Sequence, residues 1–215
     1  LIKRWLKYFP HHKYDTNYGL SESIGPGCVH LGVDNIEKIG AIGKAGYLWQ
    51  TRILDERGND VAPGEIGELA VKGPGVMKCY YKNPEATAEI LHGDWLWTGD
   101  MAREDEDGFI YLVDRKKDVI ISGGENIYPE EVIDVLLKMP EIAEAAVYGM
   151  PDPKWGEHVK ASIVCKPGRS LTVEQVQTFC RANMPSFRMP REVEFLPELP
   201  KNATGKVLIQ ALKNR

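Results

Sequence analysis

The chain has 215 residues, of which 43% are hydrophobic and 27% charged, and this composition excludes a disordered tail, a fibrous repeat and a disulfide miniprotein. Its 31 acidic and 27 basic residues give a net charge of −4, which argues against a nucleic-acid partner. The four cysteines are far apart, and the sequence shows neither a transmembrane-length apolar stretch nor a signal segment, so it favours a cytoplasmic location.

Residues 40–113 have the pattern of a β-rich region. Alternating apolar residues bounded by turn residues predict strands over 47–54, 67–71 and 109–113, the last preceded by a turn at 105–108. One short helix interrupts them, because Asn83 can cap it and Pro84 fits its first position.

The pattern changes after residue 113. The charged run at 114–118 is typical of a linker and precedes a new alternation of strands and amphipathic helices. One helix opens at Pro129, with a buried stripe predicted at Val132, Ile133, Leu136 and Leu137, and another is capped by Thr172 with Gln175 three residues on. Strands are predicted over 145–148 and 159–164, so this second part is α+β.

The first chemical motif is Tyr18-Gly19-Leu20-Ser21-Glu22. An aromatic face can stack on a base, a hydroxyl can contact a phosphate oxygen, and a carboxylate can hold Mg²⁺. A turn with a solvated glutamate explains the motif better when it is taken alone.

The second motif is Trp97-Thr98-Gly99-Asp100. A carboxylate after a glycine turn can accept both hydroxyls of a ribose, although a turn at a strand end explains the residues equally well.

The third motif runs from Asp114 to Pro129 and contains the paired glycines Gly123 and Gly124. Paired glycines permit close approach of the backbone to a ligand, whereas the simpler interpretation is a loop between a strand and a helix.

The fourth motif is Pro200-Lys201-Asn202-Ala203-Thr204-Gly205-Lys206. A lysine on a glycine loop can reach a phosphate as a point charge, but most such lysines are ordinary surface residues.

In this order, and with 67–74 and Tyr80-Tyr81 as a further match, the motifs resemble those of the AMP-forming acyl-CoA synthetases of the adenylate-forming superfamily. The resemblance implies an α/β to α+β fold. Residues 1–113 would form the β-rich, distorted barrel-like end of a large amino-terminal domain. Residues 114–117 would form a hinge, and residues 118–215 a small α+β carboxy-terminal domain with a short mixed sheet. It implies a reaction in which a carboxylic acid, with a fatty acid favoured, is joined to ATP as an acyl-adenylate and then transferred to coenzyme A.

The resemblance also implies roles for individual residues. Tyr18 corresponds to the residue that stacks on adenine, Ser21 to the hydroxyl at the AMP phosphate, Glu22 to the Mg²⁺ ligand, Asp100 to the ribose carboxylate with Arg115 beside it, and Lys206 to the catalytic lysine of adenylation. Lys117 corresponds to the hinge residue, Gly123 and Gly124 to the lining of the pantetheine tunnel, and Phe187, Arg188 and Arg191 to contacts with the nucleotide end of CoA. Lys206 also resembles a lysine that an acetyltransferase modifies in relatives.

The beginning of the chain bears on activity. It starts Leu1-Ile2-Lys3-Arg4 without Met, which indicates a fragment, although a processed amino terminus gives the same observation. The phosphate loop and acyl pocket of the family lie upstream of Tyr18, so the chain by itself is expected to be inactive. Two alternatives remain open: a ligase that loads a carrier protein or another acceptor, and a non-catalytic binding or regulatory module.

Overall fold

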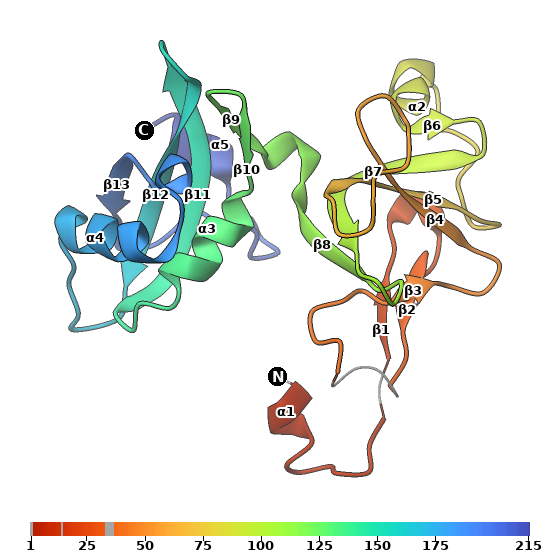
Figure 1. The fold of residues 1–215 in the computed structure, drawn as a ribbon, viewed down its shortest axis with the longest axis horizontal. Helices are drawn as coiled ribbons and strands as arrows, with labels where there is room; N and C mark the ends of the chain where they lie inside the picture. The colour runs from red at the N-terminus through yellow and green to blue at the C-terminus, as the bar shows by residue number, and fades with distance from the viewer. Residues whose placement is uncertain (1, 14, 33–36) are drawn as a thin grey trace. The chain divides into compact units, whose positions relative to one another are not determined.

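The computed structural model describes residues 2–13, 15–32 and 37–215, which fall into two compact units, residues 1–116 and 117–215. The division lies within the segment 114–117 that the sequence predicts as a hinge. Figure 1 shows the elements of both units.

Unit 1 is built mainly from two sheets. A three-stranded antiparallel sheet has the order β1-β2-β3, and a five-stranded antiparallel sheet has the order β4-β5-β7-β6, with β8 also pairing with β7. Neither sheet closes into a barrel within the described residues. The elements are α1 (Ile2–Trp5), β1 (Thr16–Tyr18), the 3₁₀ turn η1 (Ser21–Ser23), β2 (Cys28–His30), β3 (Lys44–Ala45), β4 (Gln50–Leu54), β5 (Gly67–Lys72), α2 (Pro84–Ile90), β6 (Leu91–His92), β7 (Trp95–Glu104) and β8 (Ile110–Arg115).

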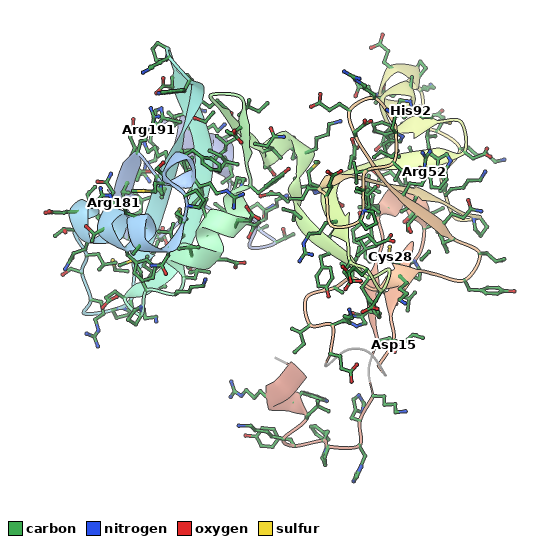
Figure 2. All side chains as sticks on the ribbon, in the orientation of Figure 1. Asp15, Cys28, Arg52, His92, Arg181 and Arg191 are labelled. Atoms are coloured by element: carbon green, nitrogen blue, oxygen red, sulfur yellow. The ribbon has the colours of Figure 1, made fainter. Side chains whose placement is uncertain are left out.

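Local sequence explains these elements with one exception. The Asn83 side chain accepts a hydrogen bond from the amide of Ala86, and this confirms the predicted cap of α2. The predicted strand over 47–54 begins only at Gln50, because Tyr47 and Leu48 lie in a turn where Leu48 has φ +64°. The core of unit 1 lies on the five-stranded sheet around Leu69, Val71, Leu96 and Ile110, and it includes Cys28 of β2 (Figure 2).

Unit 2 contains one five-stranded mixed sheet, which confirms the predicted α+β class. The order β10-β9-β12-β11 is antiparallel, and β13 pairs parallel with β12. The elements are the 3₁₀ turn η2 (Lys116–Asp118), which begins in the last residue of unit 1, β9 (Ile120–Ser122), β10 (Glu125–Ile127), α3 (Pro129–Leu136), β11 (Ile142–Asp152), β12 (Gly156–Cys165), α4 (Val173–Asn183), η3 (Ser186–Arg188), β13 (Glu192–Phe195) and α5 (Ile209–Lys213).

Apolar clusters cover both faces of this sheet. One contains Val132 and Leu136 of α3 with Val176 and Cys180 of α4. The other contains Tyr148 of β11 and Leu212 of α5, so it anchors the segment that carries Lys206. The predicted capping box of Thr172 and Gln175 is confirmed, whereas the prediction that Leu137 is buried is wrong: it caps the end of α3 and is 45% exposed.

Candidate functional site

A bulge in β7 projects Asp100, the residue predicted to bind ribose. Glu68 of β5 pairs with Met101 and Ala70 pairs with Trp97, so residues 98–100 stand opposite a single residue of β5. Bulges of this kind bend a strand and re-aim a side chain. Gly99 has φ +72°, a conformation that favours glycine, and the Thr98 hydroxyl donates to the carbonyl of Leu69 at 2.7 Å.

Asp100 is buried and both of its carboxylate oxygens have partners. Arg115 lies opposite it on β8 and contacts Oδ1 through Nε at 2.7 Å. Tyr18 of β1 donates its hydroxyl to Oδ2 at 2.5 Å. Three predicted site residues therefore meet in unit 1, although Tyr18 and Asp100 are 82 positions apart in the sequence.

The chemistry of Tyr18 follows from this contact. Burial, together with the hydrogen bond to Asp100, raises the pKa of Tyr18, so the hydroxyl stays protonated and acts as a donor. The phenol thus holds the carboxylate.

Glu22, the predicted Mg²⁺ ligand, is held by a residue from another segment. The Tyr80 hydroxyl donates to its Oε1 at 2.6 Å, and the amide of Met77 donates to its backbone carbonyl at 2.8 Å. The hydrogen bond to Glu22 raises the pKa of Tyr80 to about 12. No described residue donates to Oε2, which leaves one oxygen for a cation. Ser21 is exposed one residue earlier on the same η1 turn.

In unit 2, Gly123 and Gly124 form the tight turn between β9 and β10. Both have positive φ, +62° and +87°, as two-residue hairpin turns favour. The Gly123 amide donates to the carbonyl of Trp155 at 2.8 Å, and a Cβ at Gly123 would lie 2.8 Å from the indole of Trp155. A Cβ at Gly124 would meet no atom within 4 Å. Gly123 therefore serves packing as well as backbone conformation.

Lys206 lies on a turn that Asn202 organises. The Asn202 side-chain oxygen accepts hydrogen bonds from the amides of Thr204 and Lys206 and from the Thr204 hydroxyl, at 2.8–3.0 Å. Gly205 has φ +85° in this turn, and its amide donates to the Asn202 carbonyl. The Asn202 hydrogen bonds therefore fix the backbone at Lys206. The Lys206 side chain is exposed, which leaves its ammonium group free to reach a ligand.

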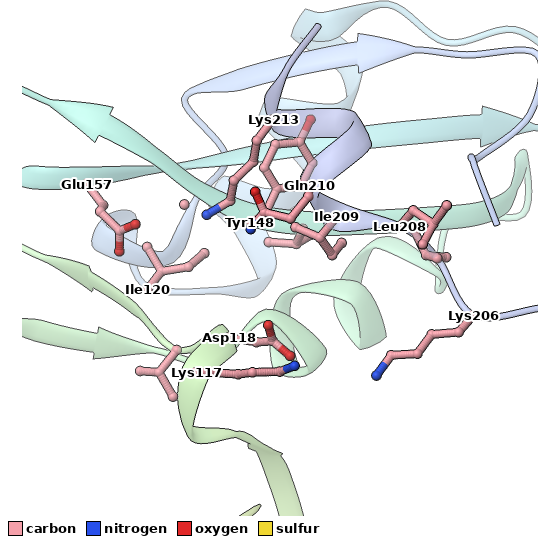
Figure 3. A pocket seen from close by; sticks show the side chains of 14 residues that line it. Lys117, Asp118, Ile120, Tyr148, Glu157, Lys206, Leu208, Ile209, Gln210 and Lys213 are labelled. Atoms are coloured by element: carbon pink, nitrogen blue, oxygen red, sulfur yellow. The ribbon is translucent and has the colours of Figure 1, made fainter. Parts of the chain in front are cut away.

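Lys206 and Lys117, the predicted catalytic and hinge lysines, line one cavity of about 420 Å³ in unit 2. Figure 3 shows their ammonium groups directed toward each other, with Asp118 beside the Lys117 side chain and with Lys213 and Glu157 farther along the wall. Among the described residues, no carboxylate lies within ion-pair distance of the ammonium group of Lys117, Lys206 or Lys213.

The predicted CoA contacts Phe187, Arg188 and Arg191 lie on or beside η3. Phe187 is 42% exposed. Arg188 forms an ion pair of 2.7 Å with Glu131 of α3. Arg191, labelled in Figure 2, pairs with Asp152 at 3.3 Å and lies 5.5 Å from the ring centre of Trp155, the same ring that packs beside Gly123. Both guanidinium groups thus already have carboxylate partners.

The described residues contain no cluster of three or more histidine, cysteine or acidic side chains arranged to hold a metal. A single carboxylate such as Glu22 nevertheless suits Mg²⁺, which usually takes one or two protein carboxylates together with substrate phosphates. Cys28 and Cys180 are buried, and burial raises their thiol pKa values to about 12 and about 11, whereas Cys79 is exposed. No helix in the described ranges could cross a membrane.

Sequence reasoning missed the supporting residues. It did not single out Tyr80 as the partner of Glu22 or Asn202 as the organiser of the lysine turn. The Asn202-Ala203-Thr204-Gly205 run carries a turn signal that could have indicated the second role. No local signal could have indicated the first, since Tyr80 and Glu22 are 58 residues apart.

Comparison with known proteins gives these contacts a family context. The profile of the family described as AMP-binding enzyme matches residues 1–81, and that of the AMP-binding enzyme C-terminal domain matches residues 131–206. A 2-succinylbenzoate–CoA ligase of Geobacillus sp. (strain WCH70) is 42% identical over 93% of this chain and 40% of its own length. A long-chain-fatty-acid–CoA ligase of Salmonella typhimurium is 41% identical over 100% of this chain and 38% of its own length.

A solved structure agrees in fold. The o-succinylbenzoate CoA synthetase from Bacillus subtilis, in complex with the acyl-adenylate intermediate OSB-AMP, has a TM-score of 0.87 and 34% identity, covering 99% of this chain and 43% of that one. The chain thus spans about 40% of the length of the curated relatives it matches. With both profiles matched in order and this fold, the chain belongs to the adenylate-forming family of AMP-binding enzymes.

Proposed function

We propose that the chain supplies the nucleotide-binding residues and the mobile lysine of an AMP-forming acid–thiol ligase. The observation that carries the proposal is the buried Asp100 carboxylate, held by Tyr18 and Arg115 on the edge of a bulge in β7. A rigid, partly desolvated carboxylate suits recognition of two neighbouring ribose hydroxyls.

Unit 1 would bind the nucleotide. Asp100 would accept hydrogen bonds from the ribose, the ring of Tyr18 would stack on adenine, and Ser21 would contact the α-phosphate. The free oxygen of Glu22 would hold Mg²⁺, which supplies charge neutralisation at the phosphates when it is bound.

Unit 2 would supply the groups that differ between the two half-reactions. In adenylation, a carboxylate oxygen of the acid attacks the α-phosphorus and pyrophosphate leaves, and the Lys206 ammonium group would stabilise the negative charge that develops there. In thioester formation, the sulfur of CoA attacks the acyl carbon and AMP leaves. The Gly123-Gly124 turn would then line the path of the pantetheine arm, with rotation at Lys117 exchanging the two surfaces.

Arg188 and Arg191 are proposed to hold the phosphates of CoA. Their present partners are Glu131 and Asp152, whose side chains are 37% and 16% exposed, so the phosphates of CoA would replace these partly buried carboxylates. The relatives named above act on different acids, 2-succinylbenzoate and long-chain fatty acids, so the fatty acid remains one member of the proposed substrate class.

Acetylation of Lys206 would remove its positive charge and switch off adenylation.

The test joins the chain to the part of a relative that lies outside the aligned segment. A chimera in which residues 1–215 replace the aligned segment of the Geobacillus ligase is assayed for AMP release and CoA thioester formation with a panel of carboxylic acids, beside the 215-residue chain alone. We expect thioester from the chimera and no ATP–pyrophosphate exchange from the chain alone. A folded chimera that forms no acyl-adenylate with any acid would contradict the proposal, and an adenylate passed only to amines would favour another acceptor.

A further inference from the structure

Glu68 of β5 is a buried carboxylate to which the proposed function gives no role. Only 6% of the residue is exposed, and burying an ionised group is unfavourable unless it is paired and hydrogen-bonded. Its two oxygens point to two different parts of unit 1.

One oxygen serves the bulge that carries Asp100. Oε1 accepts a hydrogen bond from the amide of Gly99 at 3.0 Å. A bulge disrupts the ladder of hydrogen bonds between strands and leaves the extra residues without ladder partners. Glu68 therefore replaces a ladder partner at the residue immediately before Asp100, and this fixes the direction in which the bulge projects the Asp100 carboxylate.

The other oxygen holds the end of unit 1. Oε2 contacts the ammonium group of Lys116 at 2.7 Å, and the same ammonium group lies 5.7 Å from the ring centre of Trp97. Arg115, one residue earlier, is held by Asp100. Lys117 is exposed and, among the described residues, has no ion-pair partner. Lys116 is thus the last residue of this segment whose side chain is held by an ion pair within unit 1.

We infer that Glu68 is a positioning residue that joins the Asp100 bulge to Lys116, so that any rotation of the chain begins at residue 117 and leaves the nucleotide carboxylate undisturbed. The inference rests on the proposed function for the role of Asp100 in binding the nucleotide. The link from Lys116 through Glu68 to the Asp100 bulge is a property of unit 1 alone. It can therefore be measured without nucleotide, and its failure is distinct from a failure of the proposed function.

The test is amide hydrogen exchange and ¹⁵N relaxation on the 215-residue chain. Lys116→Met removes the ion pair from a half-exposed position and should allow folding. We expect exchange at Gly99 and Asp100 to accelerate about tenfold and the order parameter of residue 116 to fall from about 0.85 toward 0.6. Lys116→Arg, which can restore the pair, should recover both values.

Two further variants separate the effect at the Asp100 bulge from the effect at residue 116. Lys116→Met leaves the buried Glu68 carboxylate without its cation, whereas Glu68→Gln places a neutral acceptor next to the Gly99 amide. Residue 116 should therefore loosen in both variants, while exchange at Gly99 changes less in Glu68→Gln. Lys72→Met is the matched control, since it breaks an ion pair of 2.8 Å with Asp94 on the surface of the same sheet. Equal effects of Lys116→Met and Lys72→Met at residues 99, 100 and 116, or no recovery in Lys116→Arg, would overturn the inference.

Discussion

The two units hold their functional side chains in opposite ways. In unit 1, Asp100 and Glu22 are partly or wholly buried, and Tyr18, Arg115 and Tyr80 fix their carboxylates by direct contacts. In unit 2, the backbone turn of Lys206 is fixed by Asn202, while its side chain is exposed. The proposed function accounts for this difference, because groups that bind a nucleotide benefit from fixed geometry, whereas a lysine proposed to act in only one of two steps must be able to leave.

Asp100→Asn tests the fixed side of this comparison and should have the largest effect on nucleotide binding. The variant keeps the shape of the side chain but removes the charge that Arg115 contacts, so we expect AMP affinity of the chimera to fall on the order of 10- to 100-fold. Isothermal titration measures it. Asp94→Asn, which alters only the surface pair with Lys72, is the control and should leave affinity unchanged.

Gly123 and Gly124 offer a matched pair in unit 2. Gly123→Ala should lower the free energy of unfolding of unit 2 by about 3 kcal/mol, because both the positive φ and the contact with Trp155 oppose a Cβ. Gly124→Ala should lower it by about 1 kcal/mol, because only the positive φ opposes a Cβ there. Urea denaturation of unit 2 gives both values. Equal losses would show that Trp155 does not restrict the turn.

A larger side chain at Gly124 tests function at the same turn. In the chimera, Gly124→Val should slow thioester formation more than adenylation, and a variant that lost only pyrophosphate exchange would speak against the proposed tunnel.

Tyr80→Phe removes the hydrogen bond that orients Glu22. We expect the Mg²⁺ concentration for half-maximal adenylation to rise by up to about tenfold, as when groups that orient a metal ligand are removed. Tyr81→Phe is the natural control, since the neighbouring Tyr81 is 86% exposed. If both variants give the same Mg²⁺ dependence, Tyr80 does not position the ligand.

Asn202→Ala should have the smallest effect. It removes the acceptor for three donors of the lysine turn, so we expect adenylation to slow about threefold while thioester formation from supplied acyl-adenylate is unchanged. Asn202→Asp keeps the acceptor oxygen and should retain the rate. Amide exchange at residues 204–206 reports the loosening directly.

Local patterns predicted most of the fold. The cap at Asn83, the capping box at Thr172 and the apolar positions of α3 are short-range signals, and the structure confirms them. The errors at Tyr47, Leu48 and Leu137 arose where an apolar residue sits in a turn or at a helix end, which periodicity does not distinguish from burial.

Contacts between distant segments could not be predicted. The sequence marked Tyr18, Glu22 and Asp100 individually, but the hydrogen bonds Tyr18–Asp100 and Tyr80–Glu22 depend on the tertiary fold. The same is true of the carboxylates that hold Arg188 and Arg191, which come from α3 and from the end of β11. Short sequence windows contain no information about such partners.

In the proposed function, the fixed carboxylates of unit 1 serve both half-reactions, while Lys206 serves one. The most direct measurement compares the two half-reactions of the chimera with Lys206→Met, using pyrophosphate exchange for adenylation and supplied acyl-adenylate for thioester formation. We predict that exchange falls at least about 100-fold while thioester formation stays within about threefold. Equal loss in both steps would contradict the division between the two units.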